Sequence, residues 1–177
     1  FFVNESSNLI LENSDIHNIN QVNITVPLIS FNSTGNLTIK SGKYISDNSN
    51  GIDNASSGNV TIGEKIEDGV IGEEPDKHSP YIEGYEYGLN TTTTTSTVNF
   101  YDGRIVGNTA VNGNINNIEI GYDILSETNE NNKEEKYLGI LPPIINITME
   151  PNVEYDDLPT AFNEARDGDT LQIQRQI

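Results

Sequence analysis

The fold is decided by the five-residue string at positions 35–39, Gly-Asn-Leu-Thr-Ile, which returns at positions 58–62 as Gly-Asn-Val-Thr-Ile. The two copies are 23 residues apart, and residues 96–100, Ser-Thr-Val-Asn-Phe, form a third copy a further 38 residues on. Apolar and polar residues alternate within each copy, which is the pattern of a half-buried β-strand. Self-similarity at this spacing predicts a repeat architecture in which each copy stacks on the next.

A glycine corner and a second apolar pair follow the string. Gly42 and Gly103 lie between two short apolar segments, where a tight corner needs a positive φ or a close approach of two backbones. Residues 102–106 match residues 41–45, and the pair 44–45 matches the pair 81–82 at an offset of 37. One period therefore holds three short strands, which predicts one coil of a parallel β-solenoid with strands of successive coils about 4.8 Å apart.

The apolar member of each repeated position should face the interior, because one coil is too small to bury its own apolar face. The expected inward positions are Leu37, Ile39, Tyr44, Ile52, Val60, Ile62, Ile82, Leu89, Val98, Phe100, Ile105 and Val111. A β-sandwich would also show short strands, but it would not predict near-identical strings at one coil length. A leucine-rich repeat would need a leucine pattern that is missing here.

The longer second offset indicates an insertion of about 15 residues, and the acidic stretch at 64–79 is its expected place. Insertions in solenoids form loops on one side, which is often the binding side. We expect residues 1–125 to form the repeats. Residues 126–152 should be a linker with edge strands, because 126–136 contain no apolar residue and read as an exposed turn.

A helix is expected only near the end of the chain. Leu158, Ala161, Phe162 and Ala165 follow the spacing of one amphipathic helix face, and Asp156 or Asp157 can cap it. Residues 153–177 are thus predicted to hold a capping helix and the first strand of a following, truncated β-helix domain. We expect the chain to be part of a longer protein.

Composition excludes several function classes. The chain has 177 residues, with 27 acidic and 9 basic side chains and a net charge of −18. This acidity disfavours nucleic-acid binding, and no apolar run is long enough to insert into a membrane. With no cysteine and two distant histidines, neither a thiolate nor a zinc site is expected. Calcium stays open, because acidic clusters at 64–76 and 129–135 could supply oxygen ligands.

The repeated strings, with residues 100–107 and 155–171, resemble bacterial cell-surface proteins with pectate-lyase-like β-helix repeats. The resemblance implies an all-β, single-stranded right-handed parallel β-helix with one short α-helix near the C-terminus. It also implies an adhesin or stalk outside the cell, on the cell surface or in the cell wall, whose partner is a host or matrix glycan or protein. Fold alone cannot settle function, since one fold hosts many activities.

The alternative is a polysaccharide lyase or glycoside hydrolase of the pectate-lyase-like class. Such lyases use a Lys or Arg base beside calcium, and the candidate bases are Lys40, Lys43, Lys65 and Arg104. Lys43 and Arg104 occupy equivalent repeat positions, which favours a structural surface role, and we expect no catalysis. An enzyme should instead show a groove in which Lys or Arg converges with carboxylates.

Four tyrosines are the candidate ligand-binding residues, Tyr81, Tyr85, Tyr87 and Tyr101. Tyr85 and Tyr87 are expected on one face of one strand. Tyrosine rings bind glycans by offering apolar faces with polar rims, so a carbohydrate-binding surface is one interpretation. The other is cross-strand aromatic packing that stabilises the sheet.

Overall fold

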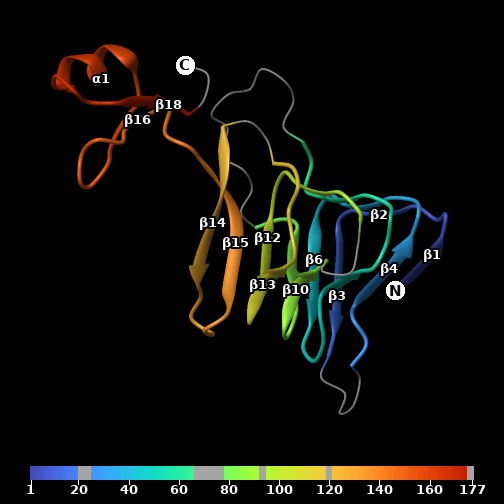
Figure 1. Cartoon of the computed structure of the whole chain (residues 1–177). Helices are drawn as coiled ribbons and strands as arrows, with labels where there is room; N and C mark the ends of the chain where they lie inside the picture. The colour runs from blue at the N-terminus through green and yellow to red at the C-terminus, as the bar shows by residue number, and fades with distance from the viewer. Residues whose placement is uncertain (20–24, 66–77, 92–94, 119–120, 175–177) are drawn as a thin grey trace.

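A computed structural model of the chain describes residues 1–19, 25–65, 78–91, 95–118 and 121–174. From residue 2 to residue 112, successive strands lie in three different sheets in turn, so each strand pairs in parallel with the strand three places before it (Figure 1). We call three consecutive strands, one in each sheet, a rung. The protein is therefore mostly β-structure built from stacked parallel strands.

The three sheets are named A, B and C in the order in which the chain reaches them. Sheet A contains β1 (Phe2–Glu5), β4 (Ile29–Ser33), β7 (Ile52–Asn54), β10 (Tyr87–Asn90) and β13 (Thr109–Asn112). Sheet B contains β2 (Leu9–Leu11), β5 (Leu37–Ile39), β8 (Val60–Ile62) and β11 (Val98–Phe100). Sheet C contains β3 (Ser14–Asn18), β6 (Gly42–Ser46), β9 (Tyr81–Glu83), β12 (Arg104–Gly107), β15 (Glu134–Ile140) and β14 (Tyr122–Thr128).

The register predicted from the repeated strings is confirmed in sheet B. Thr38 lies opposite Thr61, and Asn99 lies opposite Thr61 on the other side. In sheet C the predicted match was wrong by one residue, because Tyr44 pairs with Ile82 rather than with Tyr81. This register places two buried side chains, Tyr44 and Ile82, on the same inner face, and leaves Tyr81 outside.

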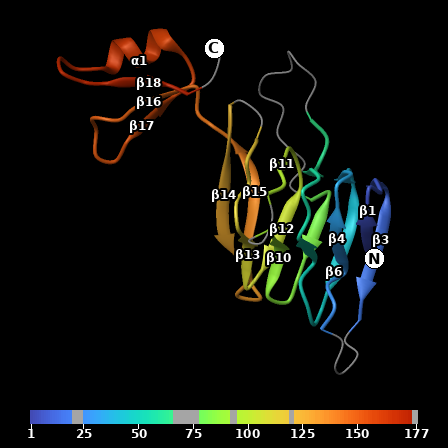
Figure 2. The ribbon, with the colours of Figure 1, turned by 45° about the vertical axis from the view of Figure 1, so that its right-hand side comes forward.

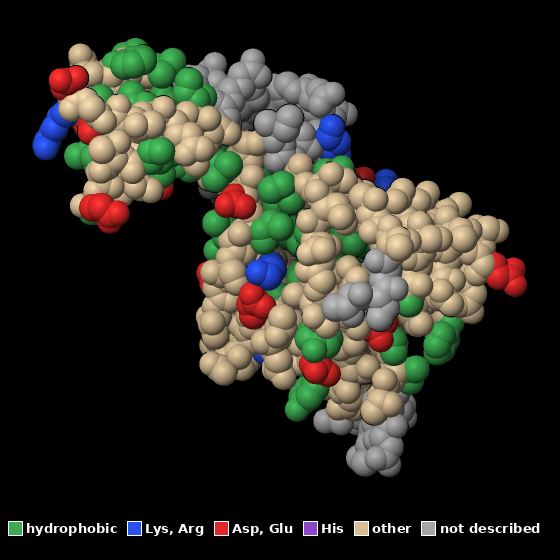
Figure 3. Space-filling view, in the orientation of Figure 1, with side chains coloured by type: hydrophobic (Ala, Val, Ile, Leu, Met, Phe, Trp, Pro, Cys, Tyr) green, Lys and Arg blue, Asp and Glu red, His purple; other side chains and the backbone are tan. Residues whose placement is uncertain are grey.

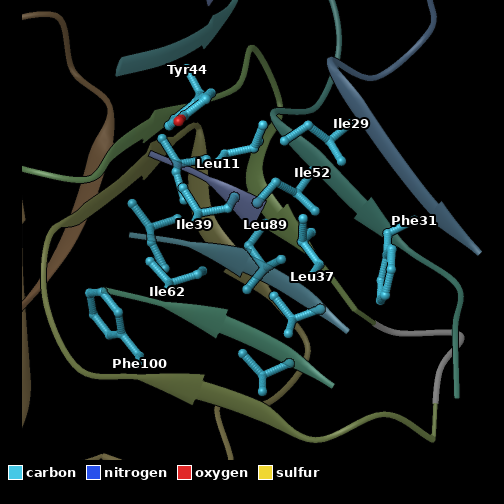
Figure 4. Packing of buried hydrophobic residues seen from close by; sticks show 14 of the residues in the cluster. Leu11, Ile29, Phe31, Leu37, Ile39, Tyr44, Ile52, Ile62, Leu89 and Phe100 are labelled. Carbon is cyan, nitrogen blue, oxygen red and sulfur yellow. The ribbon is translucent and has the colours of Figure 1, made fainter. Parts of the chain in front are cut away.

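The core runs through the space between the sheets, as expected. Eleven of the predicted inward residues are fully buried, and Val111 is partly buried against the core. Leu37, Ile39 and Ile62 point toward Leu89 and Ile52 from opposite sheets (Figure 4). Complete burial of one such side chain stabilises the fold by about 1.5–3 kcal/mol, so stacking the rungs supplies the main driving force.

The two glycine corners from sheet B to sheet C are confirmed. Gly42 and Gly103 have φ angles of +103° and +92°. A Cβ atom on Gly42 would lie 2.1 Å from the carbonyl oxygen of Ser14, and one on Gly103 would lie 2.2 Å from that of Pro80. The corners therefore need glycine both for the backbone angle and for the close approach of the neighbouring rung.

Of the segment 126–136, predicted as an exposed turn or linker, residues 130–132 do form an exposed turn, whereas the residues at its two ends belong to strands. Strands β14 and β15 form an antiparallel hairpin, and β15 pairs antiparallel with β12. The polar side chains of this segment bind partners on the sheet, as when the Glu134 carboxylate accepts a hydrogen bond from the Ala110 amide. The hairpin covers the edge of β12, which would otherwise present unpaired backbone groups.

The last part of the chain forms a small antiparallel sheet with one helix, set off from the stacked sheets (Figure 2). It contains β16 (Ile144–Asn146), β17 (Val153–Tyr155), α1 (Leu158–Glu164) and β18 (Leu171–Ile173). β16 pairs with both β17 and β18, so these pairs join residues on the two sides of the boundary expected at 152. The domain division itself stays a prediction.

The helix near the end of the chain is confirmed, with one correction to its apolar face. Asp157 is the N-cap, and its carboxylate accepts a hydrogen bond from the Thr160 amide. Ala161 is buried, but the side chain of Phe162 is 68% exposed, because the helix contacts β16 and β17 through a narrower face than the spacing suggested. Among the described residues, no helix has the length and apolar character needed to cross a membrane.

Candidate functional site

Cations and aromatic rings alternate along the outer face of sheet C. Lys43, Tyr81, Arg104 and Tyr137 are register partners on four neighbouring strands, and we call them the cation–aromatic row. Lys43 Nζ lies 5.1 Å from the centroid of the Tyr81 ring, and Arg104 Cζ lies 5.2 Å from the centroid of the Tyr137 ring. Each such contact contributes about 0.5–1 kcal/mol at an exposed site, so the row stabilises the sheet.

Carboxylates lie beside this row and pair with its Arg104 and with Lys133, a cation outside the row. Arg104 forms an ion pair with Glu135, whose side chain is only 6% exposed, and lies 3.7 Å from Glu127. Lys133 Nζ lies 2.5 Å from Glu83 Oε1. Cations and carboxylates thus converge, as the enzyme alternative requires, but these charges neutralise one another.

The hydroxyl groups of the two tyrosines in the row donate to these carboxylates. Tyr81 Oη donates to Glu83 Oε2 at 2.8 Å, and Tyr137 Oη donates to Glu127 Oε2 at 3.2 Å. Burial and the hydrogen bond to Glu83 raise the pKa of Tyr81 far above its usual value. Burial and the charge of Glu127 also raise the pKa of Tyr137. Both phenols therefore stay protonated and act as hydrogen-bond donors.

The four predicted tyrosines do not share one surface. Tyr81 is on the outer face of sheet C, Tyr87 begins β10 in sheet A, and Tyr101 follows β11 of sheet B. Tyr85 is 56% exposed and precedes β10, so the expectation that Tyr85 and Tyr87 lie on one strand was wrong. The alternation of apolar residues could not reveal this, because the chain changes sheets between Tyr81 and Tyr87.

Two of the predicted bases come together. Lys43 and Arg104 flank Tyr81 from the neighbouring strands, whereas Lys40 lies 2.9 Å from Glu64 at the end of β5. The hydrogen bond to Glu64 raises the pKa of Lys40. Lys65 follows Glu64, beyond β8. Sequence reasoning missed Tyr137 and Glu135, because the antiparallel hairpin brings them to Arg104 from more than 30 residues away.

Polar ladders cover the outer faces of the other two sheets. In sheet A, Asn90 donates to Asp53 at 3.1 Å, and Asn112 donates to Asn90 at 3.2 Å. In sheet B, Asn117 donates to Asn99 at 2.8 Å, and Asn99 donates to Thr61 at 3.2 Å. Stacked in-register strands favour such ladders, which accounts for part of the high asparagine content.

A polar groove follows the corner between sheets A and B, and we call it the A–B groove. Its volume is about 380 Å³, and its walls come from four successive rungs. Its lining residues are Glu5, Asn32, Ser33, Thr34, Ala55, Ser56, Ser57 and Thr95. No sequence pattern singled out this groove, since its residues come from four rungs that are far apart in the sequence.

The described residues contain no group of three or more His, Cys, Asp or Glu side chains that could hold a metal ion. On the face shown in Figure 3, acidic side chains lie apart from one another. Of the acidic clusters considered for calcium, residues 66–76 lie outside the described residues. In the other cluster, Glu134 pairs with Lys136 and Glu135 with Arg104. Calcium binding stays a prediction.

Comparisons of the chain with protein-family models, with curated proteins and with solved structures found no match.

Proposed function

We propose that the three sheets form a right-handed parallel β-helix that serves as a non-catalytic stalk or adhesin module outside the cell, on its surface or in its wall. The regular order of the sheets supports the helix, since each of the first four rungs adds one strand to sheets A, B and C. Right-handedness is the expectation from general sterics, because crossovers between parallel strands of one sheet are right-handed in roughly 98% of cases.

The proposal rests on one observation: polar side chains on the outer faces of the three sheets bind partners on the same sheet. The ladders on sheets A and B hydrogen-bond between rungs, and the cations of the row on sheet C contact rings or carboxylates of the same sheet. A surface that satisfies its own polar groups stiffens the stack and leaves few groups poised for chemistry. The module would hold a partner-binding region at a distance from the cell.

The second candidate is a polysaccharide lyase or glycoside hydrolase, favoured by the convergence of Lys43, Arg104 and Lys133 with Glu83 and Glu135. It is weaker because a lyase base must be free to take a proton, and the Arg104 guanidinium is bound to the Glu135 carboxylate. The phenol of Tyr81 is also held in its protonated form.

The test is an assay for unsaturated products and new reducing ends. The protein is incubated with polygalacturonate and with neutral polysaccharides, with and without calcium. We expect no product in either condition. Product that disappears in an Arg104→Ala variant, and persists in a Lys40→Ala variant, would establish the enzyme and overturn the stalk.

A further inference from the structure

We propose that Asn112, the last residue of β13, is a modification site that deamidates spontaneously in the folded protein. Asparagine is followed by glycine at two places in the chain, 50–51 and 112–113. This dipeptide is prone to deamidation, because glycine has no side chain to hinder attack by its own nitrogen on the preceding residue. The fold holds the first pair in place and leaves the second pair open.

The reaction consumes water and no other reagent. The Gly113 nitrogen attacks the side-chain carbonyl carbon Cγ of Asn112, so that an N–Cγ bond forms and the Cγ–Nδ2 bond breaks. Ammonia leaves with the proton of the Gly113 amide, and a cyclic imide remains. Water then opens one of the two imide C–N bonds, which gives either aspartate or isoaspartate at position 112.

The groups that must react are available at 112–113. Gly113 is exposed, and within the described part of the chain its amide donates no hydrogen bond. The Asn112 side chain is half-buried, and its Nδ2 donates to Asn90 Oδ1 at 3.2 Å. Among the described residues, none donates to the Asn112 side-chain oxygen. The attack therefore has to break one long hydrogen bond of the side chain.

The pair at 50–51 is held at each reacting group. Gly51 is buried, and its amide donates to the Tyr87 carbonyl oxygen at 3.0 Å. The Asn50 side chain donates to Asp53 Oδ1 at 2.6 Å and accepts from the Tyr87 amide at 3.2 Å. Attack by the Gly51 nitrogen would break all three of these hydrogen bonds. The same dipeptide thus stands in two environments, and the first pair is an internal control for the second.

The fold also retains the reactive glycine. Gly113 has a φ angle of +120°, and a Cβ atom there would lie 2.8 Å from Thr91 Oγ1. A side chain that would slow the attack is therefore opposed by the backbone angle and by the lack of space.

Deamidation would place an acceptor against an acceptor in the ladder on sheet A. Asn112 donates to Asn90, and Asn90 donates to Asp53 Oδ1 at 3.1 Å. An aspartate at position 112 has no donor, so its carboxylate would face Asn90 Oδ1. Turning the Asn90 amide would bring that oxygen against the Asp53 carboxylate instead. In isoaspartate, the carbonyl group that accepts from the Thr91 amide at 2.7 Å also leaves the main chain. Both products should loosen β13 from β10.

The assignment is tested by incubating the whole protein in mildly alkaline heavy-oxygen water and mapping its peptides by mass spectrometry. Heavy oxygen marks the residues that were hydrolysed before digestion. We expect labelled aspartate and isoaspartate to build up at position 112 at least tenfold faster than at position 50. In urea, where the fold protects neither pair, the two positions should react at similar rates. Asn112→Gln should abolish labelling at 112, because glutamine would have to close a larger ring.

Two results would overturn the assignment: no labelling of Asn112 in the folded protein, or labelling of Asn50 at the same rate as Asn112 before urea is added. The effect on the ladder has its own test in thermal denaturation. Asn112→Asp should lower the midpoint. The double variant Asp53→Asn, Asn112→Asp should recover most of the loss, because the reversed ladder has a donor at 53 and an acceptor at 112. A double variant no more stable than Asn112→Asp would contradict the loosening of β13.

Discussion

Arg104 on β12 and Glu135 on β15 form an ion pair at the place where sheet C changes from parallel to antiparallel pairing. The Glu135 side chain is 6% exposed and also accepts a hydrogen bond from Asn129 at 2.7 Å. A carboxylate buried to this degree must be paired, because removing its partner leaves an uncompensated charge. The pair therefore fastens the hairpin of β14 and β15 to the last rung.

Arg104→Met should lower the free energy of unfolding by about 3–5 kcal/mol, because it leaves the buried Glu135 carboxylate without its cation. The double variant Arg104→Met, Glu135→Leu should recover most of this loss. Urea denaturation of the wild type, both single variants and the double variant gives the coupling energy. A double variant that is no more stable than Arg104→Met would show that the ion pair does not hold the hairpin.

Gly58→Ala should destabilise the stack more than any other Gly→Ala change of comparable backbone angle. A Cβ atom at Gly58 would lie 1.6 Å from the carbonyl oxygen of Gly35 on the neighbouring rung, so two rungs must move apart. Gly168→Ala is the contrasting control, because its Cβ would meet nothing within 4 Å and only its φ of +93°, a strain that Gly58 does not have, opposes the change. That strain costs about 1–2 kcal/mol. If thermal denaturation shows the same loss of stability in Gly58→Ala and Gly168→Ala, the close contact between rungs is contradicted.

Tyr81→Phe should remove the last part of the rise in phenolate absorbance in an alkaline titration. The pKa of Tyr81 is raised by burial and by Glu83, so neutral Tyr81 stabilises the fold below the ordinary tyrosine pKa of about 10. That contribution is lost as pH rises through the higher pKa of the folded state. If the substitution instead removes absorbance that rises near the ordinary tyrosine pKa of about 10, Tyr81 is not buried against Glu83.

Asp157 should make α1 sensitive to acid. The hydrogen bonds from the amide and hydroxyl of Thr160 lower the pKa of Asp157. Its capping contribution is present above the ordinary Asp pKa and is lost as pH falls through the lower pKa of the folded state. The NMR shift of the Thr160 amide should report this change. Asp157→Asn keeps a capping acceptor without a titrating group, so it should abolish the acid transition. A persistent transition would place its origin elsewhere.

The sequence predicted the stacked strands well because the rungs repeat the same inner residues. The strings at 35–39, 58–62 and 96–100 lie in register in sheet B, and the corners at Gly42 and Gly103 have the expected positive φ. These features depend on local alternation and on glycine, both of which are visible in the order of residues.

The hairpin and the candidate sites could not be predicted in the same way. Residues 126–136 lack apolar residues, yet β15 is held by the ion pair of Glu135 with Arg104, a long-range contact without a local pattern. Phe162 has the spacing of a buried helix residue, but the small sheet beneath α1 is too narrow to cover it. The A–B groove combines residues of four rungs, and only the stacking brings them together.

The measurement that tests the stacking most directly is disulfide trapping in this cysteine-free chain. The pairs Thr38→Cys with Thr61→Cys, and Thr61→Cys with Asn99→Cys, should form intramolecular disulfides under mild oxidation, since neighbouring strands are about 4.8 Å apart. Thr38→Cys with Asn99→Cys, two strands apart at about 9.6 Å, should not. The account is contradicted if the distant pair links as readily as the adjacent pairs, or if the adjacent pairs stay reduced.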